Sequence, residues 1–173
     1  MDPSLLQKLF IKRFCLPINT DVTKYEQGDM SVNKNCLCGN YYHVACVLKD
    51  GQFDNILSIG INILGGDDEN TSGIHAEYDA LRKLPPLKYK KKMPSINLLV
   101  LRLSKTNKIQ SSKPCYKCVT MLNTVPKKQG YSLRYIYYSD GNGHIVRSTL
   151  STLEKEEKHH TRLYNNTQRR RKI

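Results

Sequence analysis

The sequence has 173 residues, of which 39% are hydrophobic, and a formal net charge of +13. These values fit one compact domain with extra length at its ends, large enough to fold without disulfide bonds. No apolar run approaches the ~20 residues that a membrane-spanning helix needs. Lys8, Lys12 and Arg13 interrupt the apolar N-terminal segment, so no secretory signal is expected. The expected location is cytoplasmic, with the nucleus and the virion left open, and no membrane contact is expected.

The hydrophobic pattern predicts strands alternating with helices. A polar, turn-rich stretch at 17–40 predicts a loop extension. The apolar run at 96–103 is typical of a strand buried on both faces. In chain order we expect a helix at 4–14, strands at 41–49 and 55–63, a helix at 75–84, a strand at 96–103, a helix at 115–125, strands at 133–139 and 144–147, and a helix from residue 151. The pattern predicts an α/β fold with an extension at 1–40, a central domain at 41–150 and a C-terminal helix and basic tail at 151–173.

The basic residues are clustered, which favours an anionic partner such as nucleic acid, a nucleotide or an acidic surface. The segment 82–92 is basic and contains Tyr89, so it could contact phosphate while the ring stacks on a base, or it could be a solvated loop. The run 169–172 could be a nuclear address, a nucleic-acid contact or only a tail.

The cysteine spacing indicates a metal site rather than disulfides. Cys115 and Cys118 form a C-x-x-C motif directly after Pro114, which favours the start of a helix. Both thiols then lie on one face of the first helical turn, where the helix dipole favours the thiolate. With His75, which precedes a second helix, they supply three metal ligands and leave one position open for water. Glu77 lies two residues from His75 and could transfer protons without being a ligand.

The other cysteines leave an alternative open. Cys36 and Cys38 could form a second metal site with Cys15, His43 or Cys46. Cys46 lies among apolar strand residues and is more typical of a core thiol. His43 is more typical of a strand residue with a satisfied hydrogen bond.

The residues H-A-E at 75–77 and P-C-Y-K-C at 114–118, in this order, resemble the zinc-dependent cytidine and deoxycytidylate deaminase superfamily. The resemblance extends from about Tyr42 to Ser139 and includes the predicted hairpin, with 60–62 closing its second strand. It implies a three-layer α/β/α sandwich around a mixed sheet of about five strands. It also implies that Zn²⁺ binds to the histidine and the two cysteines, and that the glutamate is the general acid and base.

The same resemblance implies hydrolytic deamination of a cytosine-type nucleoside or nucleotide, such as cytidine or deoxycytidylate. The substrate contacts expected from it are Asn62, Ala76, Ser112 and Tyr138. One feature departs from the family, because the 39 residues between His75 and Cys115 exceed the usual spacing and include the basic stretch 85–92.

Two alternatives remain at the level of sequence. The chain could deaminate a base in RNA or single-stranded DNA, or it could be a catalytically silent protein of the deaminase fold that binds nucleic acid. The motifs also leave open whether cytosine or adenine is the target and whether the chain forms a homo-oligomer.

Overall fold

A computed structural model describes residues 37–38, 41–63, 73–87, 92–104, 109–158 and 160. The chain divides into the units Met1–Asn35 and Cys36–Ile173, and every described residue lies in the second. The predicted helix at 4–14, the side chains of Cys36 and Cys38, and the basic segments 88–91 and 169–172 lie outside the described residues. The two predicted domain boundaries, after residues 40 and 150, stay predictions.

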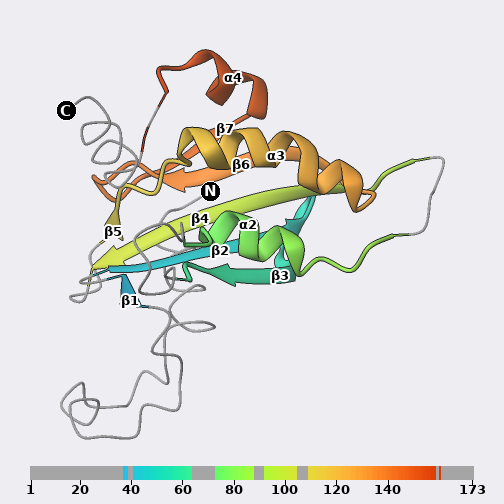
Figure 1. The fold of residues 1–173 in the computed structure, drawn as a ribbon, viewed down its shortest axis with the longest axis horizontal. Helices are drawn as coiled ribbons and strands as arrows, with labels where there is room; N and C mark the ends of the chain where they lie inside the picture. Colours follow the sequence, from blue (N-terminus) through green and yellow to red (C-terminus); the bar gives the residue numbers. More distant parts are fainter. Residues whose placement is uncertain are drawn as a thin grey trace, which may run out of the picture. The chain divides into compact units, whose positions relative to one another are not determined.

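Seven strands form one mixed sheet (Figure 1). The strands are β1 (Leu37–Cys38), β2 (Tyr41–Lys49), β3 (Gln52–Ile61), β4 (Ser95–Ser104), β5 (Ile109–Gln110), β6 (Ser132–Ser139) and β7 (Ile145–Ser148). Five longer strands lie in the order β3-β2-β4-β6-β7, while β1 pairs with β2 and β5 pairs with β4. Only β4 and β6 pair in parallel among these described strands. The predicted α/β fold with a mixed sheet is confirmed.

Three helices are described: α2 (Ala76–Arg82), α3 (Tyr116–Lys128) and α4 (Leu150–Lys155). Helix α2 packs on β2, β3 and α3, and α3 also contacts β6 and α4, so that these helices share one face of the sheet (Figure 1). The second helical layer of the expected sandwich is not among the described elements and stays a prediction. None of the described helices combines the length and the apolar character that crossing a membrane requires.

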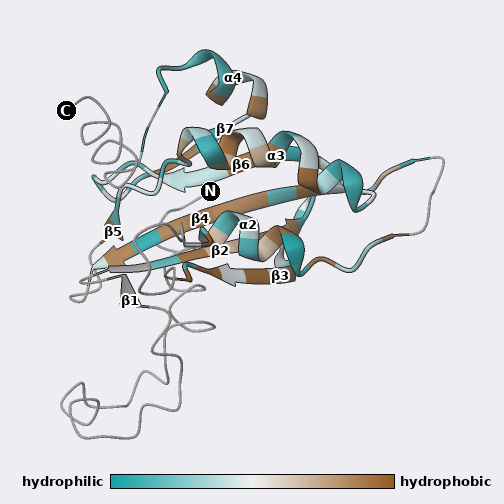
Figure 2. Ribbon diagram, in the orientation of Figure 1, coloured by the Kyte–Doolittle hydropathy of each residue, from teal (hydrophilic) through white to brown (hydrophobic). Residues whose placement is uncertain are grey.

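The core lies between the sheet and these helices. Strand β4 passes through the middle of the sheet and is largely apolar along its length (Figure 2). Alternate residues of β4 face the helices and join the core cluster, namely Ile96, Leu98 and Val100. Leu99 and Leu101 point to the opposite face and are also buried, at 5% and 2% exposure. The expectation that this strand is buried on both faces is confirmed.

A close approach between α2 and β3 fixes where the helix begins. Gly60 on β3 pairs with Ala45 on β2, so two small residues lie side by side under α2. A Cβ atom at Gly60 would overlap the backbone of Ala76 and Ala80. Because glycine leaves this space empty, the first residue of α2 can lie directly over the end of β3.

Candidate metal centre

Helices α2 and α3 both begin at the end of the sheet where β3 and β4 end (Figure 1). His75 is the N-cap residue of α2 and Cys115 is the N-cap residue of α3, both with extended backbone angles. Neither side chain makes a capping hydrogen bond to its own helix. The two side chains instead lie next to each other. Two residues that are 40 positions apart in the sequence are thereby brought to one place.

His75, Cys115 and Cys118 form a compact group of metal-ligand atoms. The Nδ1 atom of His75 lies 3.1 Å from Sγ of Cys118 and 3.5 Å from Sγ of Cys115. All three ligand atoms lie within 4.8 Å of one another, and both cysteines are buried. Within the described residues this group could hold a metal ion, as the motif predicts.

The two thiols differ in how readily they ionise. A hydrogen bond from Cys118 lowers the pKa of Cys115 to about 4, with help from His75. The same hydrogen bond, together with burial, raises the pKa of Cys118. The hydrogen bond with Cys115 raises the pKa of His75. A cation bound to both sulfur atoms would favour two thiolates and a neutral imidazole, since metal binding displaces the ligands' protons.

Glu77 lies next to the metal-ligand group and is almost completely buried, at 2% exposure. Burial raises the pKa of its carboxyl group, which is close enough to His75, Cys115 and Cys118 to interact with them. Among the described residues its Oε2 atom is buried and has no hydrogen-bond partner. A buried carboxyl oxygen without a partner is uncommon, and it fits a site that receives a metal-bound water or a substrate.

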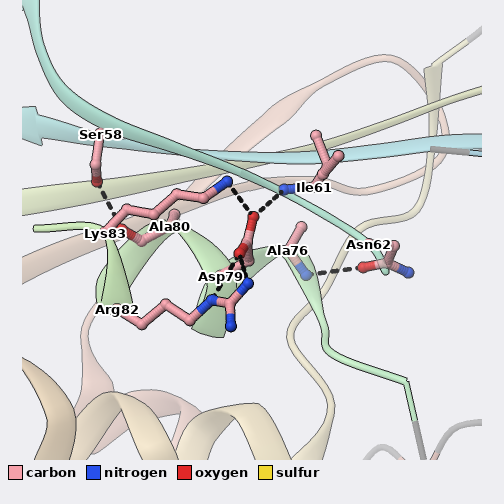
Figure 3. A network of polar contacts seen from close by, with 8 residues as sticks. All are labelled: Ser58, Ile61, Asn62, Ala76, Asp79, Ala80, Arg82 and Lys83. Carbon is pink, nitrogen blue, oxygen red and sulfur yellow. Dashed lines mark hydrogen bonds and ion pairs between the residues drawn. The ribbon is translucent and has the colours of Figure 1, made fainter. Parts of the chain in front are cut away.

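Asn62 links the end of β3 to the start of α2. Its side-chain Oδ1 accepts a hydrogen bond from the backbone N–H of Ala76 at 2.8 Å (Figure 3). Its own backbone N–H donates to the carbonyl of His43 at 3.2 Å. This hydrogen bond fixes the backbone at Ala76, and it thereby positions His75 and Glu77, the two sequence neighbours of Ala76. The predicted contacts of Asn62 and Ala76 with substrate stay predictions.

Ser112 and Tyr138 lie in the packed interior. The hydroxyl of Ser112 donates to the carbonyl of Val100 at 2.7 Å and accepts from the backbone N–H of Ser139 at 2.8 Å. Tyr138 belongs to the core cluster under the helices, and burial raises the pKa of its hydroxyl group. Through its hydrogen bonds Ser112 ties the loop before Cys115 to β4 and β6. The role of both residues as substrate contacts stays a prediction.

A buried carboxylate that the sequence did not indicate also joins α2 to β3. The Oδ2 atom of Asp79 accepts from the backbone N–H of Ile61 at 3.1 Å and from Nζ of Lys83 at 2.6 Å (Figure 3). Its Oδ1 atom accepts from Arg82 at 2.8 Å and 2.7 Å. The spacing of Asp79, Arg82 and Lys83 along a helix predicts ion pairs, but a charged helical residue is normally read as solvent-exposed. The burial of Asp79 depends on contact with β3.

The expectation for His43 is only partly correct. It lies on a strand as expected, but its Nε2 atom is buried and lacks a hydrogen-bond partner among the described residues. The expected hydrogen bond is therefore missing at this nitrogen, and the burial of the imidazole, together with its electrostatic interaction with His75 and Cys115, places it close to the metal-ligand group. Cys46 is a core thiol, as predicted, at 1% exposure.

Comparisons with known proteins add no family assignment. Neither models of protein families nor curated proteins give a significant match to this chain. The functional interpretation therefore depends on the residues and geometry of the site.

Proposed function

We propose that this protein binds zinc and deaminates a cytosine-type nucleoside or nucleotide, such as cytidine or deoxycytidylate. The observation that carries the proposal is the unpartnered, buried carboxyl oxygen of Glu77 beside the group formed by His75, Cys115 and Cys118. A structural metal site has no need for such a carboxyl group, whereas hydrolysis at a metal does.

The ligand set suits zinc. Imidazole and thiolate are the ligands that zinc prefers, and three protein ligands leave the fourth tetrahedral position open. Zinc, when bound, supplies a Lewis acid that lowers the pKa of a water molecule. Two thiolates partly neutralise the cation, so the site benefits from a base close by. Glu77 is that base, because its buried side chain lies next to both cysteines.

The chemistry divides between the residues as follows. Water adds to the ring carbon that bears the amino group, the carbon–nitrogen bond breaks, and ammonia leaves as the carbonyl forms. Glu77 accepts the two protons of the water in turn, and donates one to the ring nitrogen beside the reacting carbon and the other to the departing amino nitrogen. The raised pKa of its carboxyl group suits this exchange, since it makes the carboxylate a stronger base than that of a solvent-exposed glutamate.

The test is ammonia release by the zinc-loaded protein and by Glu77→Gln, offered cytidine, deoxycytidylate, RNA and single-stranded DNA. Loss of the proton carrier should reduce turnover by about 10²- to 10⁴-fold. The zinc content should stay unchanged, because Glu77 is not one of the ligands. The matched control is Glu154→Gln, which alters an exposed glutamate on α4 and should leave turnover unchanged. Equal ammonia release by wild type and Glu77→Gln would contradict the proposal.

A further inference from the structure

His43 lies on the helix-covered face of the sheet, at the end where the metal-ligand group is found. Side chains alternate along β2, and Ala45 and Val47, two and four residues further on, both belong to the core under α2 and α3. His43 therefore projects to the same side. Its carbonyl accepts the hydrogen bond from the backbone of Asn62, which in turn holds the first residue of α2.

The charged groups that act on the imidazole of His43 also place it near the metal-ligand group. Burial, together with the charges of Arg102 and His75, lowers the pKa of its imidazole to about 4, while Cys115 acts in the opposite direction. Arg102 is the direct partner of His43 in the pairing of β2 with β4. The imidazole is thus neutral near pH 7, within electrostatic range of two of the three metal-ligand residues.

The Nε2 atom of His43 nevertheless has no hydrogen-bond partner among the described residues, although it is buried. An unpaired buried polar atom destabilises a fold and is therefore uncommon unless a ligand or water pairs with it. His43 is not part of the group of metal-ligand atoms that lie within 4.8 Å of one another. A fourth protein ligand would also close the position that hydrolysis requires. A role in holding the metal is therefore disfavoured.

We infer that His43 is a substrate-binding residue, whose Nε2 atom hydrogen-bonds a polar group of the nucleotide bound beside His75 and Cys115. The inference rests on the proposed function for the class of ligand. A pyrimidine nucleotide presents both acceptors and donors on its base, sugar and phosphate, and a neutral imidazole can serve as either partner. The carboxyl group of Glu77 and the imidazole of His43 then satisfy their open hydrogen bonds through the same ligand.

The test compares His43→Leu, which removes the polar atoms at similar volume, with His43→Gln, which keeps a donor and an acceptor. We expect His43→Leu to raise KM for deoxycytidylate about tenfold or more, with a smaller change in kcat, since one buried hydrogen bond is lost. His43→Gln should recover part of the loss. Zinc content should equal that of wild type in both. The control is Val44→Ala, which perturbs the same strand on the opposite face and should leave KM unchanged.

Direct binding of deoxycytidylate to each zinc-loaded variant, measured by calorimetry, separates this inference from the proposed function. If wild type binds without releasing ammonia and His43→Leu binds about tenfold more weakly, the deaminase proposal fails and the role of His43 stands. If wild type deaminates and His43→Leu has unchanged KM and affinity, the inference is overturned. Loss of zinc from His43→Leu would also overturn it, by assigning His43 to metal binding or folding. Absence of binding to wild type overturns both.

Discussion

At the scale of single residues, the structure separates two kinds of buried cysteine. Cys115 and Cys118 lie within hydrogen-bond distance of His75 at the start of a helix, whereas Cys46 is buried among the core residues of a strand. A thiol becomes a metal ligand when its surroundings favour the thiolate. The hydrogen bonds that lower the pKa of Cys115 to about 4 provide such surroundings.

This difference predicts opposite outcomes for one substitution at two buried positions. Cys115→Ser should weaken metal binding by about 100-fold or more, because a hydroxyl group is a far poorer zinc ligand than a thiolate. Cys46→Ser should retain the metal and affect only folding stability. A competition titration of zinc against a chromophoric chelator measures both. If Cys115→Ser binds zinc as tightly as wild type, the three-residue metal group is wrong.

The sequence predicted the metal-ligand residues because their spacing is a local feature. Cys115 and Cys118 are three residues apart on one helix, and His75 and Glu77 flank a single alanine at the start of another. The unpartnered state of His43 was not predictable. It depends on which groups from β4, α2 and α3 surround the imidazole after folding, and a strand pattern contains no such information.

At the scale of elements, the contact between β3 and α2 sets the position of two residues of the proposed site. Asp79 holds the N–H of Ile61 at the end of β3, and Asn62 then holds the N–H of Ala76 at the start of α2 (Figure 3). These two attachments, with the close approach at Gly60, leave α2 little freedom to rotate or slide. His75 and Glu77 are fixed through the same contacts.

Asp79→Asn should lower the free energy of unfolding by about 1–3 kcal/mol near neutral pH. One carboxylate oxygen is replaced by an amide NH₂ group, which then faces donors from Arg82, Lys83 or Ile61. We expect no larger loss of stability, because the side chains of Arg82 and Lys83 are about half exposed and water can solvate their charges. Urea denaturation of wild type and variant provides the measurement.

The same variant should show a characteristic pH dependence. Burial alone would raise the pKa of Asp79, but hydrogen bonds from Lys83, Ile61 and Arg82 outweigh it and lower the pKa below the usual value of 3.8. The contribution of Asp79 to stability is therefore complete above that value and is lost as the pH falls through the folded-state pKa. The difference between wild type and Asp79→Asn should shrink only in this acidic range.

Ser58→Ala is the matched control for this junction. Ser58 lies on β3 and donates to the carbonyl of Ala80 on α2 at 2.7 Å, so its loss removes one neutral hydrogen bond between the same two elements. It should cost about 0.5–1.5 kcal/mol and show no acid-dependent change. If Asp79→Asn and Ser58→Ala respond alike to pH, the ionised state of Asp79 contributes nothing to the junction.

The predicted strands agree with the observed ones where a hydrophobic pattern continues over many residues. The strand expected at 41–49 is observed as Tyr41–Lys49, and the run at 96–103 is observed as Ser95–Ser104. Strands β1 and β5 were not predicted, because two residues carry no period and are strands only through pairing with β2 and β4. Helix α3 extends past its expected end to Lys128, with Pro126 in its last turn.

At the scale of the whole molecule, the net charge of +13 bears on the choice between the proposed substrates. A mononucleotide brings one phosphate to the site, whereas a strand of RNA or DNA brings many. Lys117 on α3 lies close enough to His75 for its charge to act to lower the pKa of the imidazole. Positive charge is therefore present beside the metal-ligand group. A charge of this size favours an anionic ligand, and it attracts a single nucleotide and a polymer alike.

Salt dependence distinguishes them, because each phosphate contact releases counterions on binding. If the protein contacts about six phosphates of a single strand, raising the salt from about 50 to 200 mM should weaken binding about 10²-fold or more. A mononucleotide with one phosphate should lose only about two- to threefold in affinity.

A chain ending at residue 168 lacks the basic run 169–172. If that run contacts the polymer, the shorter chain should show a shallower salt dependence for an oligonucleotide and an unchanged KM for deoxycytidylate. A steep salt dependence without ammonia release from any substrate would favour a nucleic-acid-binding protein that retains the metal site. Ammonia release from deoxycytidylate with little salt dependence would favour an enzyme of free nucleotides, whose positive charge serves another contact.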